Sequence, residues 1–122
     1  MSEYAFTAAN VGKIVEDQLA IMPGNTAERV RRYLVEPYLS VRPWSYGPEL
    51  FPCWIVLVDD EKSSGTGIAF CREGVWRPEL KWILLWAVPD SGYEHLGQDS
   101  SWFTSLEAAF NDSFMSTDPA EN

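Results

Sequence analysis

The feature that most constrains the fold is the stretch at residues 80–88, LKWILLWAV, where eight of nine residues are apolar and only Lys81 is charged. A strand with one face in water alternates apolar and polar residues, whereas this stretch has no polar face. It is also far shorter than the roughly 20 apolar residues that span a membrane. We therefore predict a strand inside a sheet, covered on both faces and ended by Pro89, which has no N–H to donate.

Three other stretches complete the predicted sheet. Residues 53–58 (CWIVLV) and 66–71 (TGIAFC) flank a polar segment suited to a turn, so they predict a hairpin. This hairpin leads into the strand at residues 80–88. Residues 38–44, bounded by Pro37 and Pro43, favour an edge strand because sheets accept proline at their edges. We expect an antiparallel sheet of roughly three to five strands.

Two helices are predicted before the sheet. Residues 7–22 carry an apolar stripe at helical spacing, with Thr7 or Asn10 as the N-cap. Asn25 is expected to cap a second helix because Glu28 stands three positions later, as in a capping box. The stripe of the first helix consists of Val11, Ile14, Val15, Gln18, Leu19 and Met22.

A third helix is predicted near the carboxyl end of the sequence. Thr104 takes the N-cap position, Glu107 completes a capping box, and Phe110 belongs to an apolar face. Residues 115–122 are polar and expected to fray. Apolar residues make up 46% of the sequence, enough for one core. The sequence therefore predicts a single α+β domain over residues 1–122, with the helices packed on the sheet.

Charge is distributed unevenly along the sequence. The net charge is −9, yet residues 1–48 are balanced, and residues 82–122 contain seven acidic residues and no Lys or Arg. Such a segment repels nucleic acid and attracts a basic partner, and the alternative is a surface that only serves solubility. Because residues 1–9 lack the basic and apolar regions of a signal peptide, we expect a cytoplasmic protein. We further expect a monomer or a homodimer without membrane contact.

The sequence offers two places where a metal ion could bind, a pair of cysteines and a run of three acidic residues. Cys53 and Cys71 would face each other across the predicted hairpin if its loop spans residues 60–64, and a disulfide or a metal site is then conceivable. Directly opposed residues in a sheet, however, rarely have disulfide geometry. Zinc needs four ligands and the cytosol keeps thiols reduced, which favours two buried free thiols. Asp59, Asp60 and Glu61 lack the alternating spacing of a calcium loop and suit an exposed turn. We therefore expect neither a metal nor a cofactor.

The polar loop at residues 90–101 contains His95, the one histidine of the sequence, together with Asp90, Glu94 and Asp99. Acid–base chemistry is conceivable there. However, no Ser or Cys has the sequence surroundings of a nucleophile, and a histidine in a polar loop is usually solvated. We expect no enzyme, although a small-molecule-binding or enzymatic domain using this loop is an alternative.

Aromatic residues in loop segments are the candidate binding groups. Trp and Tyr that are exposed beside acidic residues describe a protein-binding surface better than a catalytic pocket. The alternative is that these rings fold back and cap the sheet. The predicted partner-binding residues are Asp90, Tyr93, Glu94, Asp99, Trp102 and Trp44.

A small, acidic, Trp-rich α+β chain without a catalytic motif resembles the immunity proteins of bacterial polymorphic toxin systems. The segments GTGIAFC (residues 65–71) and DSSWFTSLEAAF (residues 99–110) resemble signatures of bacterial families without an assigned activity. The resemblance implies that the protein binds and neutralises a cognate toxin, here a basic toxin domain, often by covering its active site. A structural or adaptor subunit is the remaining alternative.

Overall fold

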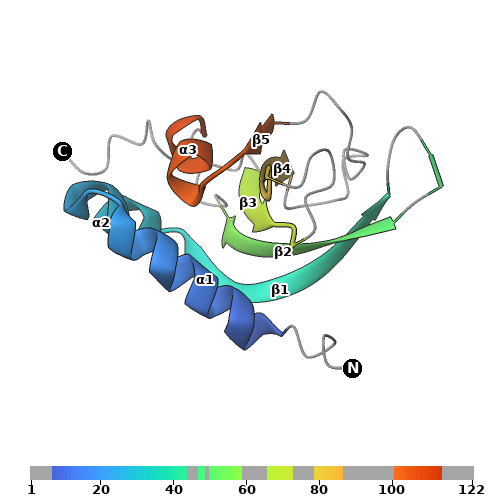
Figure 1. Cartoon of the computed structure of the whole chain (residues 1–122), viewed down its shortest axis with the longest axis horizontal. Helices are drawn as coiled ribbons and strands as arrows, with labels where there is room; N and C mark the ends of the chain where they lie inside the picture. Colours follow the sequence, from blue (N-terminus) through green and yellow to red (C-terminus); the bar gives the residue numbers. More distant parts are fainter. Residues whose placement is uncertain are drawn as a thin grey trace.

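The computed structural model describes residues 7–43, 47–48, 50–58, 66–72, 79–86 and 101–113. Within this part of the chain, the strands form one antiparallel sheet in the order β1-β2-β3-β4-β5 (Figure 1). The predicted α+β class, with two helices before the sheet and one after it, is confirmed. The elements are α1 (Ala8–Ile21), α2 (Gly24–Arg31), β1 (Leu34–Pro43), β2 (Leu50–Val58), β3 (Thr66–Phe70), β4 (Trp82–Trp86), β5 (Ser101–Phe103) and α3 (Leu106–Asn111).

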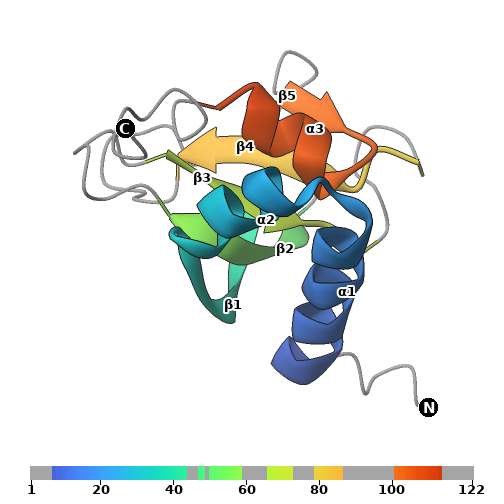
Figure 2. The ribbon, with the colours of Figure 1, turned by 90° about the vertical axis from the view of Figure 1, so that its left-hand side faces the viewer.

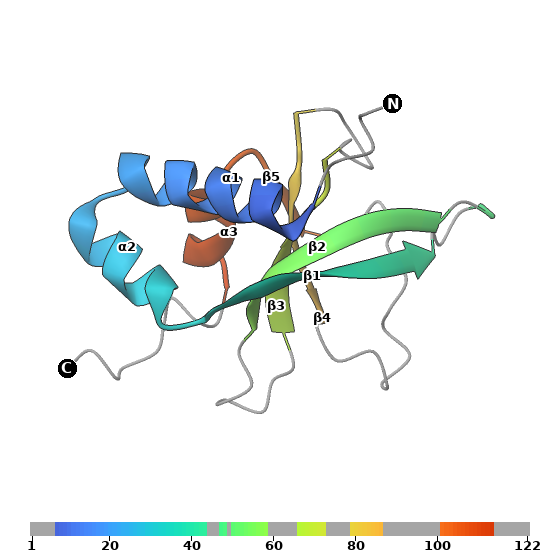
Figure 3. The same cartoon turned by 90° about the horizontal axis from the view of Figure 1, so that it is seen from below.

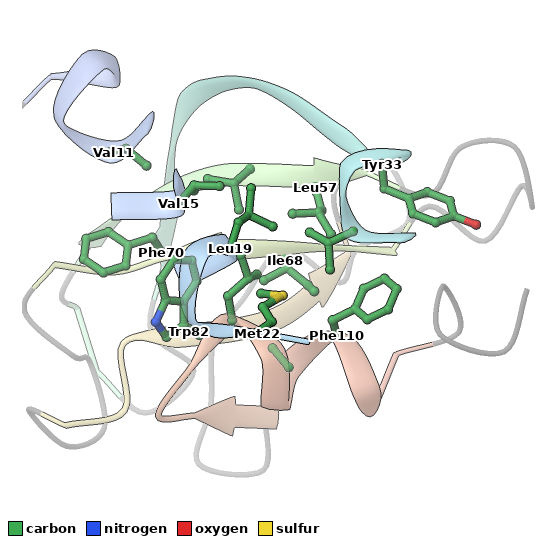
Figure 4. Close-up of a cluster of buried hydrophobic side chains, with 14 residues drawn as sticks. Val11, Val15, Leu19, Met22, Tyr33, Leu57, Ile68, Phe70, Trp82 and Phe110 are labelled. Carbon is green, nitrogen blue, oxygen red and sulfur yellow. The ribbon is translucent and has the colours of Figure 1, made fainter. Parts of the chain in front are cut away.

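All three helices lie on one face of the sheet, as Figures 2 and 3 show from two directions. The main core lies between these two layers (Figure 4). The apolar stripe of α1 lies there in one cluster with side chains of β2, β3, β4 and α3, because each amphipathic element must bury its apolar side against another. The residues of this main core include Val11, Val15, Leu19, Met22, Tyr33, Leu57, Ile68, Phe70, Trp82 and Phe110.

The other face of the sheet carries a second buried cluster. Its members come only from β2, from β3 and the residue after it, and from β4. The central strands therefore bury both of their faces, which explains why their sequences are continuously apolar. The cluster consists of Cys53, Ile55, Ala69, Cys71, Ile83 and Leu85.

Strand β4 occupies the interior position predicted for residues 80–88, between β3 and β5. Trp82 and Leu84 pack in the core beneath the helices, and Ile83 and Leu85 belong to the cluster on the opposite face. Successive side chains of a strand point to opposite faces, so this burial on both sides accounts for the missing polar alternation. The prediction of a doubly covered strand is confirmed for the described residues.

Strand β1 lies at the edge of the sheet, as its prolines predicted, but it begins at Leu34 and not at residue 38. The register of β1 with β2 shifts between Leu34 and Tyr38. Pro37 falls inside this irregularity. An edge position and a bulge are the two places where a strand tolerates a residue without an N–H.

The two amino-terminal helices begin differently. Thr7 caps α1, with its side chain and that of Asn10 forming a reciprocal capping box. Helix α2 starts one residue before the predicted cap: Pro23 occupies the N-cap position and makes no side-chain hydrogen bond. Asn25 is already inside the helix, where its Oδ1 accepts from the N–H of Thr26 at 3.0 Å. The prediction that Asn25 caps α2 was therefore wrong.

The cap of α3 is Ser105 and not Thr104. Ser105 Oγ accepts a hydrogen bond from the N–H of Ala108 at 3.1 Å, while Thr104 is exposed. The reason is the short strand β5, which the sequence pattern did not predict. Trp102 pairs with Ile83 of β4, so the chain stays extended through Phe103 and turns into the helix one residue later than expected.

Candidate protein-binding surface

Large apolar side chains are exposed at one place on the sheet. Tyr38, Leu39 and Val41 of β1 expose 45%, 49% and 52% of their surface, and Leu50 at the start of β2 exposes 63%. Figure 3 shows this end of the β1–β2 ribbon extending away from the helices. The helices leave Leu39, Val41 and Leu50 uncovered on their face of the sheet, whereas Tyr38 lies on the opposite face. We call the four residues the β1 edge surface.

The hydrogen-bond pattern fixes which backbone groups each strand directs at its neighbours. The N–H of Cys71 donates to the carbonyl oxygen of Lys81 at 2.7 Å, so the backbone of Cys71 faces β4. In the β2–β3 register, Cys71 stands opposite Cys53, one step beyond the pair of Trp54 and Phe70. Opposed residues alternate between hydrogen-bonded and non-hydrogen-bonded pairs. Cys53 and Cys71 are therefore a non-hydrogen-bonded pair, and the backbone of Cys53 faces β1.

The same alternation shows what β1 presents at its outer edge. Ser40 is paired with Cys53, so the N–H and carbonyl of Ser40 point inward to β2. Those of Leu39 and Val41 consequently point away from the sheet. Strand β1 is the outermost strand formed by the described residues. A free edge of this kind is a template for a further strand, and the prolines at positions 37 and 43 keep it short.

The other side of β1 carries Tyr38, Ser40 and Arg42, of which Arg42 is buried. Arg42 is only 2% exposed, and its Nε donates to Ser40 Oγ at 2.7 Å. Because strand side chains alternate between faces, Ser40 and Arg42 lie on the same side as the thiol pair and away from Leu39 and Val41. A buried guanidinium requires hydrogen-bond partners, and Ser40 of the same strand supplies one of them.

The two cysteines are buried free thiols, as predicted. Cys71 Sγ donates to Cys53 Sγ at 3.2 Å. This hydrogen bond and the burial of both sulfurs raise the pKa of the Cys71 thiol far above its usual range, while the nearby Arg42 guanidinium acts in the opposite direction. A buried neutral thiol is a poor nucleophile at neutral pH, so the pair does not resemble a catalytic cysteine.

Of the predicted partner-binding residues, the structure describes Trp102. Its side chain is half-buried and packs against the cluster on the face opposite the helices. Trp44, Asp90, Tyr93, Glu94 and Asp99 lie outside the described residues, as does the predicted turn at residues 59–61.

Neither a metal site nor a membrane-spanning helix is found among the described residues. No group of three His, Cys, Asp or Glu side chains in this part of the chain could hold a metal ion. No described helix is long and apolar enough to cross a membrane. Comparisons with protein-family models, curated proteins and solved structures found no match for the sequence.

The β1 edge surface was not predicted from the sequence. The sequence feature that could have indicated it is the spacing of Leu39 and Val41, which are two positions apart and so lie on the same side of an edge strand. Alternation alone predicts that one face of such a strand is buried, and the natural assumption is that the apolar face turns inward. Here Arg42 is buried instead, and Leu39 and Val41 stay exposed.

Proposed function

We propose that this chain is a protein-binding domain, and that it acts as an immunity-type inhibitor of a basic toxin domain. The observation that carries the proposal is the β1 edge surface, where four large apolar side chains are exposed on the strand that lies at the edge of the described sheet, beside its outward-facing backbone groups. Isolated exposed apolar residues are ordinary, whereas a group of them at one sheet edge is typical of an interaction site.

The chemistry of this surface favours a partner that adds an extended segment. The outward N–H and carbonyl groups of Leu39 and Val41 offer hydrogen bonds to a neighbouring strand. The side chains of these two residues offer apolar contacts on one face of that strand. Strand addition of this kind obtains affinity from the main chain and specificity from alternate side chains.

Net charge favours a basic partner over a second copy of the chain. Each copy carries a net charge of −9, so two copies repel one another as they approach. A basic domain is instead attracted, which raises its association rate most strongly at low salt. The excess of acidic residues at positions 82–122 is the source that we propose for this attraction.

The test uses a toxin candidate encoded beside this protein's gene, with its active site disabled. Leu39→Ser and Val41→Ser should each weaken binding by at least about tenfold, as expected of apolar anchors in an interface. Ile21→Ser is the matched control, because Ile21 is 75% exposed but lies on α1, away from the β1 edge surface. Binding is measured by titration calorimetry and folding by circular dichroism.

A separate variant tests the charge argument. Replacing Asp90 with Asn, Glu94 with Gln and Asp99 with Asn should slow association at low salt and flatten its salt dependence. If the partner binds the Leu39 and Val41 variants as tightly as it binds the unchanged protein, the β1 edge surface is not the interface. If no neighbouring product binds and sedimentation shows a stable dimer, the adaptor alternative replaces the inhibitor.

A further inference from the structure

The two thiols occupy a position in the sheet that suits a covalent bond. Cys53 and Cys71 are the two cysteines of the sequence, and they face each other as a non-hydrogen-bonded pair of β2 and β3. In such pairs the Cα atoms lie about 4.5 Å apart, within the range of about 4.4–6.8 Å found for disulfides. The backbone therefore already has the spacing that a cross-strand disulfide requires.

The sulfur atoms are also directed at each other. Cys71 Sγ lies 3.2 Å from Cys53 Sγ, in a hydrogen bond between the two thiols. A disulfide bond of about 2.05 Å then requires the sulfurs to approach by roughly 1 Å, which side-chain rotation can supply. Cys53 is 0% and Cys71 is 1% exposed. Because both side chains are buried, only a small oxidant is suited to reach them.

We propose that Cys53 and Cys71 form a reversible oxidation site at which hydrogen peroxide converts the thiol pair into an intrachain disulfide. This proposal is independent of the protein-binding function. The bond would join β2 to β3 on the sheet face opposite the helices and would close the segment at residues 54–70 into a ring. It would leave the β1 edge surface unchanged.

The position of Cys71 makes it the first sulfur to react. It follows the last residue of β3 and precedes the exposed Arg72, so local opening of the strand end reaches it before Cys53. The Arg42 guanidinium also favours its thiolate, although the net effect of burial and of the Cys53 hydrogen bond is a pKa well above the usual range. Oxidation is therefore slow at neutral pH.

The reaction balances with one molecule of hydrogen peroxide. The thiolate of Cys71 attacks a peroxide oxygen, the O–O bond breaks, and hydroxide leaves while a sulfenic acid forms on Cys71. The sulfur of Cys53 then attacks the sulfur of Cys71, the S–O bond breaks, and the thiol proton leaves with the oxygen as water. Two thiols and one peroxide thus yield one disulfide and two water molecules.

The first experiment needs no substitution. The full chain is treated with hydrogen peroxide, unfolded in urea, and reacted with a maleimide to count the remaining thiols by mass. We expect both thiols to disappear with the loss of two hydrogen atoms, no covalent dimer, a Cys53–Cys71 peptide after proteolysis, and full recovery on reduction. Because the thiolate is the attacking form and the pKa of the Cys71 thiol is raised, the oxidation rate should increase as the pH is raised above neutrality.

The second experiment asks whether the fold accepts the bond. A disulfide that fits the native geometry should raise the melting temperature, by on the order of 10 °C for a ring of this size. Cys53→Ser and Cys71→Ser are controls that should give a single oxidised thiol or a covalent dimer and no such rise. The proposal is overturned if the unchanged chain keeps both thiols, forms sulfinic acids or dimers instead, or melts at a lower temperature after disulfide formation.

Discussion

At the scale of single residues, the start of α3 distinguishes two neighbouring hydroxyl groups. Ser105 Oγ accepts from the N–H of Ala108, whereas Thr104 is exposed and precedes the cap. Ser105→Ala should therefore lower the free energy of unfolding by about 1 kcal/mol, the usual effect of removing an N-cap. Thr104→Ala should change it by less than about 0.5 kcal/mol, as for most surface substitutions. Urea unfolding of both variants measures the difference, and equal losses would mean that Thr104 shares the capping role.

At the scale of elements, one side chain of α1 helps to position α3. Gln18 Oε1 accepts a hydrogen bond from the N–H of Leu106 at 2.9 Å, and Leu106 is the first residue of α3. This N–H belongs to the first turn of a helix, which has no acceptor within the helix itself. Gln18→Leu should destabilise the protein by about 1–3 kcal/mol because it leaves a partly buried donor without an acceptor.

Gln18→Glu is the matched variant for this contact. A carboxylate can accept the same hydrogen bond, and a negative charge is favourable at the amino end of a helix. Urea unfolding should therefore show most of the stability retained in Gln18→Glu and lost in Gln18→Leu. A similar loss in both variants would show that the size of the side chain matters more than its acceptor.

At the scale of the whole molecule, the net charge of −9 opposes the compact state through self-repulsion. Raising the salt concentration from about 0.01 M to about 0.15 M shortens the screening length from about 30 Å to about 8 Å. The melting temperature should therefore rise by a few degrees over this range, as followed by circular dichroism. The variant with Asp90→Asn, Glu94→Gln and Asp99→Asn should rise less, because fewer charges repel.

If the melting temperature falls as salt is added, attraction between surface ion pairs is the dominant electrostatic effect. Arg31 and Glu16 form a contact of 3.1 Å between α2 and α1, and both side chains are more than half exposed. Surface pairs of this kind usually contribute about 0–1 kcal/mol and weaken as salt rises. A melting temperature that falls with salt would mean that such attractions outweigh the repulsion.

The sequence by itself determined the elements that carry a strong local pattern. Residues 80–88 had to be covered on both faces because they have no polar face, and Pro37 and Pro43 required an edge position for β1. The stripe of α1 and its capping by Thr7 followed from spacing and from side-chain chemistry. These features depend on contacts within a few residues, so they can be read without knowledge of the fold.

Only the tertiary structure decided where neighbouring elements end and which apolar side chains remain exposed. Ser105 replaced Thr104 as the cap of α3 because pairing of Trp102 with β4 keeps the chain extended. Leu39 and Val41 stay exposed because the helices do not reach that end of β1. Strand pairing and the packing of helices on the sheet bring together residues that are distant in the sequence. A local sequence pattern does not specify which distant residues will pack against it.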